Sequence, residues 1–202
     1  MKTEINVTGS VVVWDPLVRV FHWSLVFFFL LAYISEDELM AIHSQAGYVV
    51  TLLIIFRMFW GIFGSKPARF NSFISKPSTV IAHLKGMFSR RAPHYQGHNP
   101  VAAVMVIALL ISLFLVSFTG LVVYAGEGQG PLANTIFSSW RGDWIEETHE
   151  FLANFTVLLV MLHVLGVVVS SLLEGENLVR AMITGRKRNR DHWADFDGTE
   201  VQ

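Results

Sequence analysis

Four long apolar stretches dominate the pattern of hydrophobic and polar positions along the chain. Each is about 20 residues or longer, which is the length an α-helix needs to cross the hydrocarbon core of a bilayer. Polar and charged residues gather between these stretches and at the two ends of the chain. The pattern predicts an all-α integral membrane protein, a four-helix transmembrane bundle with helices over residues 17–34, 41–63, 101–125 and 145–173.

The first stretch also has some features of a signal peptide. It is too long for the apolar region of such a peptide, it contains His22, and it lacks a small-x-small cleavage site. We therefore interpret it as a membrane anchor.

The connection between the second and third stretches carries a shorter amphipathic pattern. Pro77 can begin a helix, and the apolar residues that follow recur at i, i+1, i+4, i+7 and i+8. This pattern predicts a surface helix over about 77–88, with the apolar residues Val80, Ile81, Leu84, Met87 and Phe88. The expected organisation is one transmembrane domain over 1–185, followed by a polar C-terminal tail over 186–202.

Lysine and arginine are distributed unevenly between the connections. The 64–100 connection contains six of them and the segment after 174 contains five, whereas the 35–40 and 126–144 connections contain Arg141 alone. Because cytoplasmic connections carry the excess of positive residues, both termini and the 64–100 connection are expected in the cytoplasm. The expected location is a membrane that the chain crosses several times.

The composition supports a membrane protein and narrows its chemistry. The chain has 202 residues, of which 52% are hydrophobic and 15% charged, against about 25% charged in soluble domains. It has no cysteine, which excludes disulfides, iron–sulfur clusters, thiolate zinc sites and covalent haem attachment. The eight histidines are then the best remaining soft metal ligands. The net charge of −1 carries no evidence for nucleic acid, and no nucleic-acid partner is expected.

Two histidines lie in the fourth stretch, which is otherwise mostly apolar. His149 and His163 are 14 residues apart (163 − 149), which places them within about 40° of one another around a helix. They are about 21 Å apart along its axis. A membrane histidine can simply bond to a neighbouring helix, but two on one face, one near each leaflet, suggest two stacked metal centres.

The direction of each helix determines which histidines can meet. His22 lies near the cytoplasmic start of the first helix, and His163 lies toward the cytoplasmic end of the fourth. His43 and His149 both lie near the periplasmic starts of their helices. The predicted pairs are therefore His22 with His163 and His43 with His149. The histidines of the 64–100 connection lack a metal-ligand spacing and are interpreted as solvated.

Four membrane histidines favour haem over other metal groups. Ligation by two histidines inside a four-helix bundle suits a non-covalent b-type haem with both axial positions filled, and the pairing predicts two such haems. Filled positions disfavour oxygen activation and favour one-electron exchange. Zinc would have half of its tetrahedral shell empty.

Three further residues are candidates for contact with these cofactors: Arg19, Arg57 and Gly47. Arg19 shares a face with His22 three residues later, and it either binds a haem propionate or reaches lipid phosphate. Arg57 follows His43 by 14 residues (57 − 43) at a depth where exposure to lipid is costly, so pairing with a carboxylate of the protein or a cofactor is expected. Gly47 lies one turn after His43, where it either admits a flat ring or permits close helix packing.

Several motifs in these positions resemble the bacterial cytochrome b561 and nickel-iron hydrogenase b-type cytochrome family. They are VWDPLVRVFHW (Val13 to Trp23), HSQAGY from His43, FRMFWGIFGSKPARFNSF (Phe56 to Phe73), the GHNP turn and the two histidines of the fourth helix. The resemblance covers about residues 10–185. It implies four transmembrane helices around two b-type haems, with ligands at the same four histidines. It also implies quinone as a partner near the cytoplasmic haem.

The leading hypothesis is therefore a membrane cytochrome that transfers electrons between a periplasmic redox partner and the quinone pool. The resemblance implies that the partner is a hydrogenase, a dehydrogenase or a c-type cytochrome. An alternative is a stand-alone quinol oxidoreductase that gives electrons to oxygen species. A further alternative is a non-redox, metal-handling membrane protein.

Overall fold

The computed structural model describes residues 10–36, 39–72, 74, 76–88 and 100–188 of the chain. Four of its helices are long and apolar enough to cross a membrane: α1 (Pro16–Ile34), α2 (Met40–Phe63), α4 (Pro100–Gly126) and α5 (Asp143–Glu174). Each begins and ends within two residues of its predicted range. The prediction of a four-helix membrane bundle is confirmed.

The shorter elements lie in the connections and near the chain ends. The amphipathic helix α3 (Pro77–Phe88) occupies its predicted range and packs against α4. Three short 3-10 helices precede α3 or α5: η1 (Lys66–Ala68), η2 (Phe70–Ser72) and η3 (Ile136–Ser139). The remaining elements are β1 (Ser10–Val12), α6 (Leu178–Thr184) and β2 (Arg186–Arg188).

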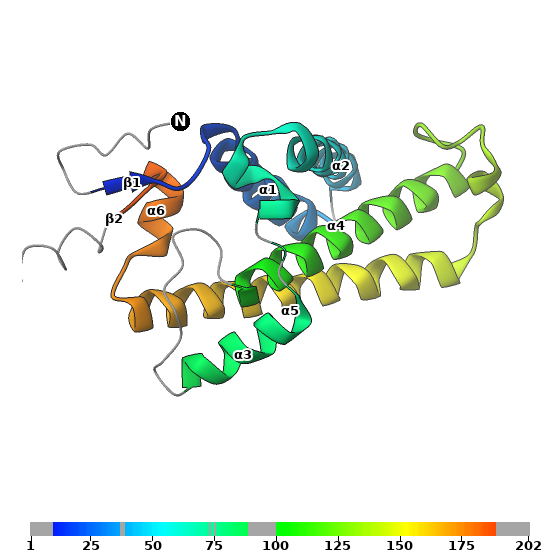
Figure 1. Ribbon diagram of the computed structural model, residues 1–202. Coiled ribbons are helices and arrows are strands. Elements are labelled where there is room, and N and C mark those ends of the chain that lie inside the picture. The colour runs from blue at the N-terminus through cyan, green and yellow to red at the C-terminus, as the bar shows by residue number, and fades with distance from the viewer. Residues whose placement is uncertain (1–9, 37–38, 73, 75, 89–99, 189–202) are drawn as a thin grey trace, which may run out of the picture.

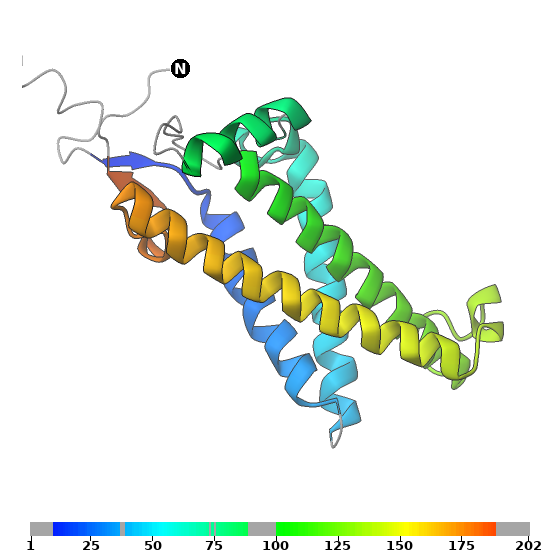
Figure 2. The same ribbon diagram turned by 90° about the horizontal axis from the view of Figure 1, so that it is seen from below.

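The four long helices form two hairpins, which Figures 1 and 2 show from two directions. α1 packs along α2, α4 packs along α5, and the hairpins meet mainly where α2 contacts α4. Neither α1 nor α2 packs against α5 to a comparable extent. Any group that links α5 to the first hairpin must therefore be a long side chain or a ligand between them.

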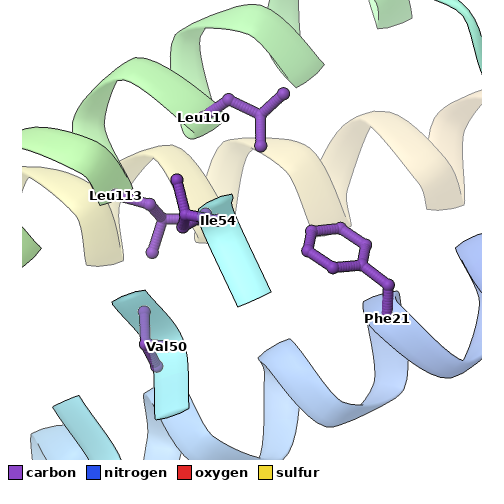
Figure 3. Close-up of a cluster of buried hydrophobic side chains, with 5 residues drawn as sticks. All are labelled: Phe21, Val50, Ile54, Leu110 and Leu113. Carbon is purple, nitrogen blue, oxygen red and sulfur yellow. The ribbon is translucent and has the colours of Figure 1, made fainter. Parts of the chain in front are cut away.

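The apolar core lies where α1, α2 and α4 meet (Figure 3). It consists of five buried side chains, one from α1 and two each from α2 and α4: Phe21, Val50, Ile54, Leu110 and Leu113. No side chain of α5 belongs to this cluster. Instead α5 contacts α4 through small and polar residues, such as the fully buried Thr156, whose hydroxyl lies 2.6 Å from that of Ser112. Small residues and hydroxyl pairs of this kind are typical of helix contacts in membranes.

The start of α1 follows the local sequence rules. Asp15 caps the helix by accepting a hydrogen bond from the backbone N–H of Leu17 at 2.7 Å, and Pro16 is the first helical residue. The aspartate satisfies one of the free N–H groups of the first turn, and the proline has the backbone angle that this position needs.

The first and last described segments of the chain meet beside the start of α1. β1 and β2 pair antiparallel with Val11 opposite Lys187, and the N–H groups of Val13 and Trp14 both donate to the carbonyl of Gly185. Gly185 ends α6 in the left-handed region with φ of 78°, where a side chain would be strained.

This contact includes the first residues of the predicted polar tail over 186–202, because Arg186–Arg188 form the strand β2. Backbone pairing with β1 holds these polar residues, a long-range contact that their composition does not signal. Residues 189–202 lie outside the described residues. We call the end of the bundle with β1, α6 and β2 the terminal end, and the end with the 35–39 and 127–142 connections the loop end.

Candidate cofactor sites

Four histidine rings face one another in two pairs across the bundle. His22 of α1 and His163 of α5 have ring centres 6.5 Å apart at the terminal end. His43 of α2 and His149 of α5 have ring centres 6.1 Å apart at the loop end. The structure thus brings together the same two pairs that the helix directions predict, and both join α5 to the first hairpin, against which it packs little.

The distances within both pairs match two imidazoles bound to one metal ion. A metal–nitrogen bond of about 2.0 Å, with about 1.1 Å from nitrogen to ring centre, places two opposed ring centres about 6.2 Å apart. A direct hydrogen bond of about 2.9 Å between two ring nitrogens would bring the centres to about 5 Å. The observed 6.1 and 6.5 Å fit the first arrangement and are too long for the second.

Hydrogen bonds orient both rings at the loop end. His43 Nδ1 lies 2.9 Å from the carbonyl oxygen of Ala32, and His149 Nδ1 lies 3.0 Å from that of Val116. A carbonyl only accepts, so Nδ1 of each ring carries the proton and Nε2 has the free lone pair. A histidine ligand usually binds its metal through one nitrogen while the other donates to such an acceptor.

The rings at the terminal end are held differently. His22 Nδ1 is buried and has no hydrogen-bond partner among the described residues, while the ring packs edge-on against Trp23 at 5.2 Å between centres. The His163 ring likewise forms no hydrogen bond within the described part of the chain. Within the described part of the chain, packing contacts orient this pair.

Glycines give space beside the rings. A Cβ atom at Gly47, one turn after His43, would meet no atom within 4 Å, and the same holds at Gly166, three residues after His163. That Gly47 admits a flat ring stays a prediction, as does its alternative of close helix packing. The residues present therefore fit a flat group with a metal ion between each pair of imidazoles.

α4 contributes residues to the loop-end site that sequence reasoning missed. A Cβ atom at Gly120 would lie 2.9 Å from Cε1 of His149, so the ring rests directly on the backbone of α4. Thr119 Oγ1 lies 3.1 Å from His149 Nδ1. The sequence of α4 has no charge and no histidine, and it indicated a packing surface that could border a ligand, with no residue singled out as a contact. The one available signal was the run of small and hydroxyl residues Ser117, Thr119 and Gly120 at the depth of His149.

Arg57 lies in the membrane span as a buried cation. Its side chain is 4% exposed, its guanidinium carbon lies 4.8 Å from the ring centre of Phe70, and Nη1 has no partner among the described residues. A buried guanidinium needs an acceptor to offset the loss of water. Arg57 thus has an unused donor near the terminal end.

Arg19 has a partner that the sequence did not suggest. Its Nη2 donates to the carbonyl of Ile183 near the C-terminal end of α6, where the helix dipole favours a cation. This contact ties the first turn of α1 to α6. The predicted contact of Arg19 with a haem propionate stays a prediction, as does the lipid alternative, and the buried Nε remains without a partner in the described residues.

Four apolar helices with paired, half-buried histidines and no cysteine are typical of a multi-pass membrane cytochrome that binds haem without a covalent link. Residues 13–185 match the model of the family described as prokaryotic cytochrome b561, and the chain belongs to this family. The resemblance found in the sequence is thereby confirmed. The chain is a multi-pass membrane protein of electron transport that binds haem b.

Similar proteins carry a more specific description. The chain is 25% identical to the "Probable Ni/Fe-hydrogenase B-type cytochrome subunit" of Rhizobium leguminosarum bv. viciae, with 90% of each chain covered. A protein of the same description from Bradyrhizobium diazoefficiens is 23% identical, over 90% of this chain and 87% of the relative. Another from Azotobacter chroococcum is 26% identical, over 76% and 70%. No solved structure matches the chain significantly.

Proposed function

We propose that the chain is a di-haem electron carrier that spans the bacterial inner membrane, with both termini in the cytoplasm. His22 and His163 would hold one haem iron at the terminal end. His43 and His149 would hold the other at the loop end. Electrons pass between a redox protein on the periplasmic side and quinone on the cytoplasmic side.

One observation carries this proposal: two pairs of imidazoles, each spaced for a single metal ion, stand at opposite ends of one membrane helix. When bound, haem supplies reversible one-electron chemistry at its iron. The protein supplies the rest. Its imidazoles would bind the iron, its helices would exclude water, and α5 would hold the two sites about 21 Å apart along its axis.

A nickel-iron hydrogenase is the partner that the relatives favour, since each is described as a cytochrome subunit of that enzyme. A dehydrogenase or a c-type cytochrome would bind on the same, periplasmic side. Quinone is supported by the family resemblance and by Arg57, whose free donor suits a carbonyl oxygen as well as a carboxylate. The metal-handling alternative has less support, because the histidines meet in twos, and within the described residues no three His, Asp or Glu side chains form a metal-binding cluster.

Transfer across a membrane tests the proposed function directly. Vesicles containing the purified protein and trapped ferricyanide are given dithionite outside, and the trapped ferricyanide is followed optically. We expect reduction at a rate that falls at least about tenfold in the His43→Ala variant, because one of the two steps across the bilayer is lost. Protein-free vesicles give the background. Equal rates for the two proteins would contradict transfer through both sites.

Arg57→Gln tests whether the buried guanidinium acts on the terminal-end site. A cation near a haem favours the less positive, ferrous iron, so its removal is expected to lower the ferrous-to-ferric ratio of that site at a fixed potential by roughly tenfold. A redox titration of the purified protein measures the change. Arg69→Gln is the matched control, since Arg69 is exposed and donates to the Gly64 carbonyl. An unchanged potential in Arg57→Gln would mean that Arg57 has a structural role only.

A further inference from the structure

The two histidine pairs differ in how their Nδ1 atoms are engaged. At the loop end both rings point Nδ1 at backbone carbonyls, those of Ala32 and Val116. At the terminal end, Nδ1 of His22 is buried without a partner in the described part of the chain. The two sites therefore have the same ligand type but differ in the hydrogen bonds to their imidazoles. This difference affects the redox chemistry that each site would support.

Thr119 adds a second acceptor at the loop end. Its side chain is 7% exposed, and its Oγ1 lies 2.9 Å from the carbonyl oxygen of Leu115, 3.0 Å from that of Val116 and 3.1 Å from Nδ1 of His149. The hydroxyl has one proton, which goes to one of the two carbonyls. Its oxygen then accepts from Nδ1–H of His149.

The opposite orientation of these bonds is unfavourable. If Thr119 donated to an unprotonated Nδ1, the lone pair of that nitrogen would face the carbonyl oxygen of Val116 at 3.0 Å, acceptor against acceptor. Gly120 makes the close approach possible, because a side chain there would meet the ring. The Thr119 hydroxyl and the Val116 carbonyl thus keep the proton on Nδ1 of His149 and leave the lone pair of Nε2 free for a metal ion.

We propose that Thr119 is a positioning residue for His149, and that its hydroxyl, with the carbonyls of Val116 and Ala32, gives the loop-end site the lower redox potential of the two. This inference rests on the proposed ligation by the four histidines. An imidazole that donates from Nδ1 gains negative charge and becomes a stronger ligand, which favours the ferric over the ferrous iron. With the lower potential at the loop end, an electron supplied there by a partner protein passes downhill to the terminal end.

The test is a redox titration of the purified holoprotein, followed optically, with Thr119→Val. Valine keeps the shape of the side chain and removes the hydroxyl. The component that His149→Ala abolishes is expected to gain about threefold in its ferrous-to-ferric ratio at a fixed potential, which is about 28 mV for one electron. Thr119→Ser, which restores a hydroxyl, should return the wild-type value. Thr148→Val is the control, since Thr148 adjoins His149 in sequence but donates to the Trp144 carbonyl.

Each outcome decides one part of the proposal. A shift confined to the loop-end component and reversed by Thr119→Ser supports it, and so does haem loss in Thr119→Val that serine restores. An unchanged potential, a shift in the other component, or haem loss that serine does not restore overturns the role of Thr119. A wild-type loop-end site of higher potential overturns the predicted order. If His149→Ala retains both components, the proposed ligation itself fails.

Discussion

Alanine in place of either His43 or His149 is expected to halve the haem content and to remove the same spectral component. The two rings face one another with 6.1 Å between ring centres, and each imidazole supplies one ligand, so the proposed site needs both histidines. Changes around a metal ligand weaken binding by about 10–100-fold, and loss of the ligand itself should exceed this range. His22→Ala and His163→Ala should remove the other component. Haem content and the reduced-minus-oxidised spectrum provide the measurement.

His83→Ala is the matched control for these variants. It removes a histidine of α3 that the pairing does not include, so both components should remain. The pairing would be refuted if His22→Ala and His43→Ala removed the same component. It would also be refuted if loss of one histidine of a pair spared the component that loss of the other abolishes.

Leucine at Gly47 is expected to remove the loop-end haem as completely as His43→Ala does. Among the described residues, a Cβ atom at this position would meet no atom within 4 Å, so there is open space where the leucine side chain begins. A haem beside His43 would not tolerate it, because the added atoms would occupy the space of the flat ring. The terminal-end component and the helical circular dichroism should be unchanged, which separates loss of cofactor from loss of fold.

Leu52→Phe provides the comparison for Gly47→Leu. It also adds bulk to α2, but Leu52 is 65% exposed and faces away from the core. Both haems should be retained in that variant. Two retained haems in Gly47→Leu would show that the space at Gly47 serves helix packing or lipid, the other interpretation of this glycine.

The sequence was most informative where a single helix carries the signal. The apolar runs predicted all four spans, because span length and hydrophobicity are local properties. The 14-residue spacing and the loop charges predicted which histidine rings would face one another, since a helix fixes both the face and the depth of a side chain. That these rings bind haem iron remains a prediction, as do the roles of Arg57 and Gly47.

The sequence was least informative where two distant segments meet. The sequence suggested a haem propionate or lipid phosphate as the partner of Arg19. It did not signal the hydrogen bond that Arg19 donates to the carbonyl of Ile183, 164 residues further along the chain. The strand β2 is polar and short, and only its pairing with β1 identifies it. Thr119 and Gly120 acquire a role only because the His149 ring rests on α4. The middle of α5 adds a further case, since Thr156 lies seven residues from each of its two histidines and bonds to Ser112.

The number of haems per chain is the sharpest test of ligation by the four histidines. We expect two b-type haems for each polypeptide of the purified protein, both low-spin with two imidazole ligands by electron paramagnetic resonance. A single haem per chain, or a high-spin signal that indicates an open axial position, would contradict it.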